Sequence, residues 1–347
     1  MADFAMVIGL FVILGCIFVL PFCSRKISEE LEIFLFIMGI FAVSITVQWE
    51  LNLAIEALTE PLFITVAVLA AGVLFKYLQG PIDRNLTKIV EKMGQKLFVF
   101  VTIVALGLLS SIITAIIAAL VLVETAHTLN LDKNDEIKFI ILACFAIGFG
   151  SVLTPGGGPL ATITIAKLRS APYFADFWFL FNDLWYYIFP AIVAIGLLSL
   201  KFVREHHKAE QVAGERFEET LGTICKRAVK IYLFIMGLVF LGAGFTPLID
   251  LYIAKVPYYF LYWVNIISAI LDNATLAAAE IGPSMTLLQI TAATLGLVIA
   301  GGMLIPGNIP NIIAANTLKI KSKEWARVGV PLGLAIMLVV FVVIVAF

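Results

Sequence analysis

The chain of 347 residues is 62% hydrophobic and only 14% charged, with a mean hydropathy of +1.06. This composition excludes an ordinary soluble domain, in which about half of the residues are apolar and about a quarter are charged. The formal net charge of −1 gives no basic excess for nucleic acid, so no nucleic-acid partner is expected. We expect a multi-pass protein of the cell (inner or plasma) membrane, with lipid as a partner.

Two apolar runs at the start of the chain predict two membrane helices. The first, residues 4–22, is about long enough to cross, because a hydrocarbon core of about 30 Å takes roughly 20 helical residues. It lacks a basic leading segment and a small-residue cleavage site, so we expect a retained helix and not a signal peptide. With a second run at residues 33–47, it forms the predicted N-terminal part, residues 1–57.

The middle of the chain, residues 58–205, is predicted to hold four apolar segments of two kinds. Two are plain membrane helices, residues 62–77 and 177–200. The other two are interrupted by small or polar residues: 97–123 contains SSIIT, and 139–166 contains TPGGGP. Prolines and glycines in an apolar segment indicate a broken helix.

The last part, residues 206–347, repeats this order after a long basic stretch. Its apolar segments are a helix at 231–249, a segment interrupted by LDNAT at 257–285, a segment interrupted by PGNIPN at 286–318, and a helix at 331–347.

Aligned residues support an internal repeat. Placing Pro155 on Pro306 sets SVLTPGGGPLATITIAKL over GMLIPGNIPNIIAANTLK. Upstream, SSIITAIIAA falls on SAILDNATLA, which sets Thr114 against Asp272. Each copy therefore holds, in order, a plain helix, a segment with a polar centre, a segment broken by Pro and Gly, and a second plain helix.

The distribution of basic residues favours a topology with two re-entrant hairpins. If residues 97–123 and 257–285 each enter and leave on one side, eight crossings remain and both termini lie outside. Of the 23 Lys and Arg residues, only Lys167, Arg169 and Lys255 then lie outside, as the positive-inside rule requires. An odd number of crossings separates equivalent points of the two copies, so the copies are inverted. The predicted fold is an all-α integral membrane protein, an inverted-repeat secondary transporter with two re-entrant hairpins and two broken transmembrane helices.

The two breaks are candidate ion or substrate sites, although a simple kink is the alternative at each. Backbone groups opened by a break survive in a membrane only where they meet protein or a water-filled cavity. Free carbonyls at the end of a half-helix can bind a cation, and the opposing N-terminus favours an anion. The residues assigned to these sites are Thr154, Pro155, Gly156 and Gly157 in the first break and Pro306, Gly307, Asn308 and Asn311 in the second.

The hairpin centres supply the hard oxygen ligands that a small cation prefers. Asp272 stands out because it is the only charged residue between Lys255 and Glu280, and a carboxylate at that depth is expected to bind a cation or exchange protons. Capping of the following helix is the alternative role, and it is compatible with the first. The predicted cation or proton ligands are Ser110, Ser111, Thr114, Asp272, Asn273 and Thr275.

Three other acidic residues have simpler explanations. Asp183 could relay protons, but the aromatic residues that follow it favour an interfacial cluster. Glu124 and Glu280 lie near hairpin ends and are expected to be solvated. No Lys or Arg lies inside a predicted span, which favours a cation over an anion as the transported species. No catalytic set is recognisable, so we do not expect an enzyme.

Two copies of a hairpin followed by a helix broken at G-x-x-x-[TI]-P-G resemble the ion transporter superfamily, which includes arsenite permeases, D-type sodium/proton antiporters and divalent anion sodium symporters. The LDNAT tip and short length are most similar to its compact prokaryotic branch of predicted cation transporters. The resemblance covers about residues 62–347. It implies a homodimer, an elevator-like shift, and a central site with sodium at Ser110, Thr114, Asp272 and Asn273. The paired Ser-Asn-Thr tips of the symporters are missing here.

The sequence therefore predicts a secondary active transporter that exchanges sodium, or a similar monovalent cation, for protons, with Asp272 as the shared ligand. The alternative is a sodium-coupled symporter of a small anion or carboxylate. A passive channel is disfavoured because inverted repeats with hairpins indicate alternating access. The expected partners are lipid and a small ion substrate, with sodium as the transported or coupling ion and no organic cofactor.

Overall fold

The computed structural model describes residues 2–24, 26–27, 30–62, 92–129, 131–202, 220–252 and 255–346, together with single positions between 65 and 77. Within these residues every regular element is a helix, which confirms the predicted all-α class. Four of the described helices are long and apolar enough to cross a membrane, as an integral membrane protein requires.

The plain helices follow the predicted segments but extend into polar sequence. They are α1 (Ala2–Cys23), α3 (Leu31–Thr46), α9 (Phe179–Phe202), α10 (Leu221–Leu251) and α15 (Ser322–Ala346). The predicted starts of α10 and α15, at residues 231 and 331, are late because the apolar run marks the lipid-facing part and not the polar first turns. Residues 51–62 are also helical, whereas most of the predicted helix at 62–77 lies outside the described residues.

Each interrupted segment in the first half forms two helices with a non-helical turn between them. Helices α5 (Gln95–Ile113) and α6 (Ala115–Leu129) meet at Thr114, whose φ of 72° breaks the helical path. Helices α7 (Lys133–Ser151) and α8 (Pro159–Lys167) are separated by residues 152–158. Pro159 lies in the first turn of α8, where a missing N–H has no helical partner to lose.

The second half has the same layout in shorter pieces. Helix α11 (Tyr258–Val264) continues as the 3₁₀ helix η2 (Asn265–Ala269), and the chain then turns into α12 (Asn273–Glu280). Helix α13 (Leu287–Gly301) is separated from α14 (Ile309–Thr317) by a break that contains the 3₁₀ turn η3 (Ile305–Gly307).

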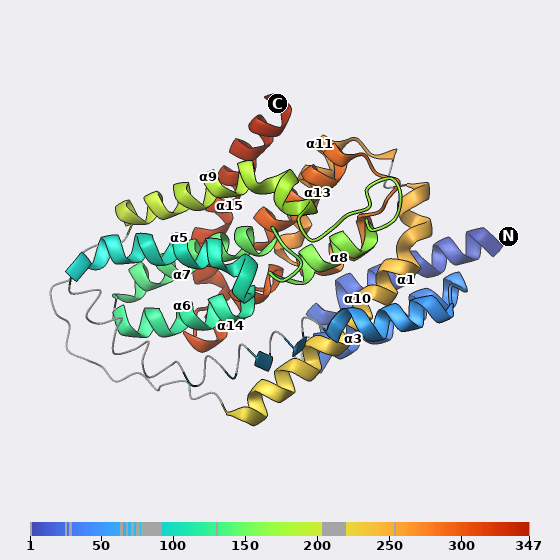
Figure 1. The fold of residues 1–347 in the computed structure, drawn as a ribbon, viewed down its shortest axis with the longest axis horizontal. Coiled ribbons are helices and arrows are strands. Elements are labelled where there is room, and N and C mark those ends of the chain that lie inside the picture. The colour runs from blue at the N-terminus through green and yellow to red at the C-terminus, as the bar shows by residue number, and fades with distance from the viewer. Residues whose placement is uncertain are drawn as a thin grey trace.

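Helix α10 packs along α3 and also contacts α1, and these three helices lie together at one side of Figure 1. Glycines allow the close approach. A methyl group on Gly237 would meet the Phe36 Cα at 2.6 Å, and one on Gly39 would meet the Gly237 carbonyl oxygen at 2.6 Å. Small residues at such crossings permit van der Waals contact between helix backbones, which is how membrane helices associate.

The remaining helices pack around the interrupted segments. Helix α5 contacts α7 and α9, and α11 contacts α13. The helix that follows each turn packs against the other half of the chain: α6 contacts α14, and α12 contacts α8. This packing brings the turns and breaks of both halves into the middle of the molecule.

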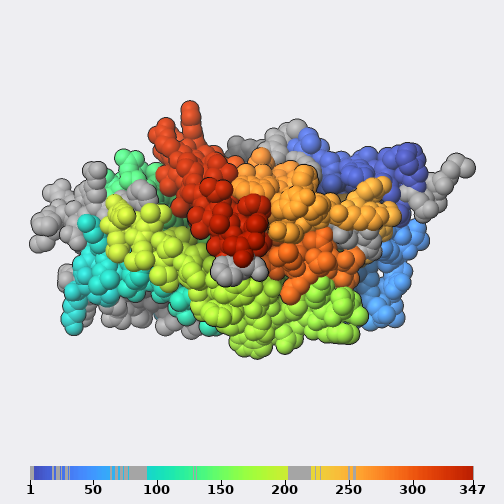
Figure 2. Space-filling model, turned by 90° about the horizontal axis from the view of Figure 1, so that it is seen from above, coloured from blue at the N-terminus to red at the C-terminus, as the bar shows by residue number. Residues whose placement is uncertain are grey.

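The outer surface of the described helices is apolar, as contact with lipid requires. Helix α15, red in Figure 2, lies at the surface, where Leu338, Val339 and Val342 are exposed. Helix α5 is among the four helices that could span a membrane, although the charge distribution predicts it as one arm of a re-entrant hairpin. The expected eight crossings, the sidedness and the outside termini remain predictions.

Candidate functional site

Each turn between the paired helices ends in a residue that caps the next helix. The Thr114 Oγ1 accepts a hydrogen bond from the Ile117 N–H at 3.4 Å at the start of α6. The Asp272 Oδ2 accepts from the Thr275 N–H at 3.0 Å and from the Thr275 hydroxyl at 3.3 Å at the start of α12. The two aligned residues thus have the same local role, and the capping anticipated for Asp272 is present. Of the two, Asp272 alone brings a charge.

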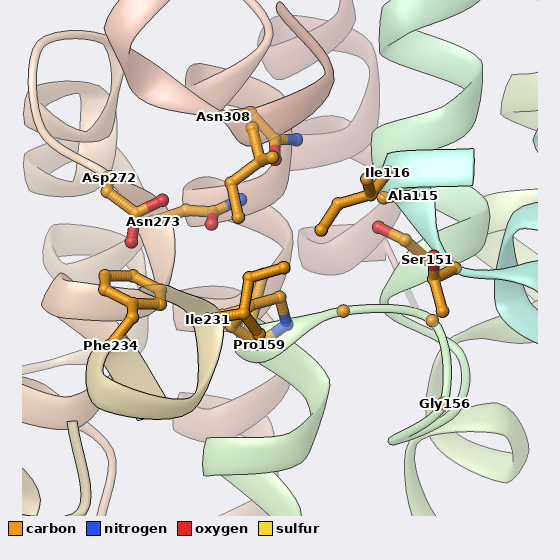
Figure 3. Close-up of a pocket in the computed structure, with 15 residues that line it drawn as sticks. Ala115, Ile116, Ser151, Gly156, Pro159, Ile231, Phe234, Asp272, Asn273 and Asn308 are labelled. Carbon is orange, nitrogen blue, oxygen red and sulfur yellow. The ribbon is translucent and has the colours of Figure 1, made fainter. Parts of the chain in front are cut away.

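Both turns and both breaks meet at a cavity of about 30 Å³ (Figure 3). Asp272 and Asn273 lie on one side of the cavity, with Asn308 above them in the view, and Ser151 lies across from them. Since one water needs about 10–15 Å³ on this measure, the cavity has room for a small ion with water.

Helix α10 supplies the apolar side of the same cavity. Ile231 and Phe234 lie below Asp272 and Asn273 in Figure 3. The cavity therefore lies at the seam between α10, which packs with α1 and α3, and the helices of the interrupted segments.

Four helices begin at the cavity. Its lining includes the first residues of α6, α8 and α14, together with Asp272 and Asn273 at the start of α12. The N-terminus of a helix carries partial positive charge and open N–H groups. The Asp272 carboxylate is the charged side chain that the described residues place in this lining, so it faces a positive environment from the backbone.

In the second break, side chains donate hydrogen bonds to backbone carbonyls that have lost their helical partners. The Asn311 Nδ2 donates to the Gly301 carbonyl at 2.8 Å and to the Leu304 carbonyl at 2.9 Å. The Trp325 Nε1 donates to the Gly302 carbonyl at 3.2 Å from α15. The Asn311 Oδ1 is buried with no hydrogen-bond partner among the described residues.

The first break is bonded to the first turn instead. The Thr154 hydroxyl donates to the Ser111 carbonyl, and the Ala115 N–H donates to the Gly157 carbonyl at 2.8 Å. A side chain at Gly157 would collide with the Ser151 backbone, so this position requires glycine. The turn before α6 and the break after α7 therefore form one hydrogen-bonded unit.

The structure brings about half of the predicted site residues to the cavity. Those that line it are Thr114, Gly156, Gly157, Asp272, Asn273 and Asn308. The others do not line it: Ser110, Ser111, Thr154, Pro155, Thr275, Pro306, Gly307 and Asn311.

Among the four predicted sodium ligands, Ser110 is the one that does not line the cavity. Its hydroxyl is fully buried and lies 2.7 Å from the Gly107 carbonyl and 3.0 Å from the Ile147 carbonyl, so it joins α5 to α7. Ser268, aligned with Ser110 in the second half, likewise donates to the Leu297 carbonyl of α13 at 3.2 Å. The aligned serines share a packing role that the sequence did not reveal.

The expectation that Glu124 and Glu280 are solvated is wrong, since each is only 7% exposed. The Asn265 Nδ2 donates to the Glu280 Oε1 at 2.7 Å and contacts the Ala293 carbonyl at 3.3 Å. Helix α12 is enclosed by α8, α10 and α13, which buries the end that a hairpin topology places near the surface.

Asp183 connects two helices in addition to preceding an aromatic cluster. The Thr291 hydroxyl donates to the Asp183 Oδ2 at 2.8 Å, which links α9 to α13. Trp185 and Tyr186 pack edge to face in the cluster expected there. Asp183 does not line the cavity, so the structure gives it a bridging role between helices.

Several residues that line the cavity were not predicted as site residues, among them Ser151, Ile231 and Phe234. Ser151 directly precedes the first break, and its position beside the glycines was an available signal. Ile231 and Phe234 lie in an ordinary apolar helix, so no pattern in the sequence distinguishes them. Only the packing of α10 against α8 and α12 identifies them.

The chemistry of the cavity is that of oxygen ligands. A carboxylate, two side-chain amides and hydroxyls are ligands for hard cations, whereas thiolate and imidazole select transition metals. The described residues include no group of three or more His, Cys, Asp or Glu that could hold a metal ion.

The described helices and their apolar surface define an all-helical membrane protein with a small cavity in its middle, lined by one carboxylate and a few polar side chains among apolar ones. The chain belongs to the family described as "Protein of unknown function (DUF1646)", whose sequence profile matches residues 7–347. A comparison with curated proteins gives no match.

Proposed function

We propose that this protein is a secondary active transporter that exchanges sodium, or a similar monovalent cation, for protons. One observation carries the proposal: a buried carboxylate, Asp272, lines a cavity where the turns and breaks of both halves of the chain meet. A carboxylate at that place in a membrane protein is costly unless it binds a cation or a proton. Binding the two in alternation is the chemistry of exchange.

The ligands around Asp272 suit a cation without its full water shell. Asn273 and Asn308 each contribute an amide, and the Asn273 amide lies 3.3 Å from where a Cβ on Gly301 would stand. The absence of a side chain at Gly301 lets this amide pack against the end of α13. A volume of about 30 Å³ holds a small ion and a water.

The arrangement of the halves supports alternating access by inverted repeats. Helix α6 contacts α14 and α12 contacts α8, so the two halves exchange equivalent contacts around the cavity. The cavity lies against α10, and a shift of the interrupted helices along α10 would expose it to the other side. The resemblance to the ion transporter superfamily implies the same movement, together with a homodimer.

The test is sodium-driven proton movement in liposomes that contain the purified protein and a proton-sensitive dye. The wild type should show saturable flux, and Asp272→Asn should abolish it. Asp132→Asn is the matched control, because Asp132 also caps a helix, accepting from the Asp135 N–H at 2.8 Å, but lies on the exposed start of α7. Antiport that survives in Asp272→Asn would contradict the proposal.

A second candidate function is sodium-coupled symport of a small anion or carboxylate. It is favoured by the four helix N-termini that meet at the cavity, because such termini bind anionic groups. In that case Asn308 and the Thr114 hydroxyl would hold the anion, while sodium would neutralise Asp272. Uptake of small carboxylates that requires sodium, without sodium-driven proton flux, would identify this function.

A further inference from the structure

Helix α12 carries a buried carboxylate at each end. Asp272 caps its N-terminus, and Glu280 is its last residue, about 12 Å away at 1.5 Å per residue. The two are 9% and 7% exposed. The partial charges of a helix stabilise an anion at its N-terminus and oppose one at its C-terminus. The same helix therefore favours a carboxylate at Asp272 and a neutral carboxylic acid at Glu280.

The hydrogen bonds of Glu280 suit a group that gains and loses a proton. Its Oε1 accepts from the Asn265 amide at 2.7 Å, and this bond is possible in both protonation states. The second oxygen, Oε2, remains for the proton. Asn265 is 1% exposed and also contacts the Ala293 carbonyl, so its orientation is set by α13.

The charged and titratable groups around this end of α12 are few among the described residues. Lys167 at the end of α8 donates to the Ala278 carbonyl of α12 at 2.7 Å and to the Gly242 carbonyl of α10 at 3.1 Å. Helices α13 and η2 contain no titratable residue, and Tyr232 of α10 donates to the Leu58 carbonyl. Lys167 is thus the cation that α8 brings to the neighbourhood of the last turn of α12, and it contacts the backbone there.

A second and larger cavity, of about 220 Å³, adjoins this end of α12. It lies along the same seam of α8 and α10 as the small cavity and is lined by Glu56, Glu60, Lys167, Thr246 and Pro283, among others. Pro283 follows Glu280 by three residues. The volume is enough for a group of waters, and although Glu280 itself does not line the cavity, Lys167 connects its wall to the Ala278 carbonyl in the last turns of α12.

We propose that α12 is a two-ended coupling element in which Asp272 binds the transported cation and Glu280 carries the exchanged proton. This proposal rests on the proposed cation/proton exchange. It differs in one respect: the proton is carried by Glu280, whereas the proposed function has Asp272 bind the cation and the proton in turn. The Glu280 Oε2 takes a proton from water of the larger cavity and returns one to water in the other state. Movement of α12 as one rigid piece links the two events.

The test separates cation movement from proton movement in liposomes containing the full-length protein. Glu280→Gln keeps the shape of the side chain and an oxygen to accept from Asn265, but it cannot exchange a proton. We expect sodium-driven proton flux to fall at least tenfold, while exchange of radioactive sodium for unlabelled sodium stays within twofold of wild type. The pH dependence of that sodium exchange should also flatten.

Glu124→Gln is the matched control, because Glu124 is as buried as Glu280 but lies on α6. It should leave proton coupling unchanged. Wild-type coupling in Glu280→Gln, or uncoupling by Glu124→Gln alone, would overturn the assignment. If Glu280→Gln is unstable, Glu280→Asp keeps a carboxyl and must retain part of the proton flux for the assignment to stand. A wild-type protein that moves neither sodium nor protons would instead remove the proposed function itself.

Discussion

Asn311 offers the sharpest test of how the second break is held. Its Nδ2 bridges the Gly301 and Leu304 carbonyls at 2.8 and 2.9 Å, and the residue is fully buried. Asn311→Leu has a similar size but no donor. Each lost hydrogen bond accounts for about 1 kcal/mol, and leaving the buried Gly301 carbonyl unsatisfied raises the total loss of unfolding free energy to about 2–4 kcal/mol; the Leu304 carbonyl still accepts from the Gly307 N–H at 3.4 Å.

The measurement is the unfolding of the purified protein in detergent, together with sodium exchange in liposomes. Because the break lies beside the cavity, we expect weaker sodium exchange in addition to the loss of stability. Asn182→Leu is the control, since Asn182 is exposed on α9 and such a surface change should stay within about 0.5 kcal/mol. Equal stability and transport for wild type and Asn311→Leu would refute the view that Asn311 closes the break.

Two further predictions concern packing around the same helices. Trp325→Phe removes the Nε1–H that donates to the Gly302 carbonyl and leaves a cavity, because Trp325 is fully buried; the unfolding free energy should fall by about 2–4 kcal/mol, and no change would contradict this packing. Gly237→Ala would place a methyl 2.6 Å from the Phe36 Cα, and overpacking of this kind costs about 1–3 kcal/mol. Gly222→Ala, at an open position on the same helix, should instead be neutral or stabilising, so unfolding curves in which the two variants match would contradict the close contact between α3 and α10.

The elements of this protein were largely predictable because membrane segments follow simple physical rules. An apolar run long enough to cross, and Pro or Gly within it, are local features, and the breaks at 152–158 and 302–308 occur where Pro155 and Pro306 predict them. The starts of α10 and α15 were predicted about ten residues too late because hydropathy reports contact with lipid and not the extent of the helix.

By itself the sequence determined the all-α membrane class and the positions of both turns and both breaks. It also singled out Asp272 as a candidate site residue, because a lone charge in an apolar segment is costly. Only the tertiary structure decided which of those residues share a cavity. The Ser110 hydroxyl hydrogen-bonds to the Ile147 carbonyl, buried Glu280 accepts a hydrogen bond from Asn265, and Phe234 of α10 lines the cavity. Each of these contacts depends on how helices pack against one another, and most of them join segments that are distant in the chain. No local sequence pattern therefore predicts them.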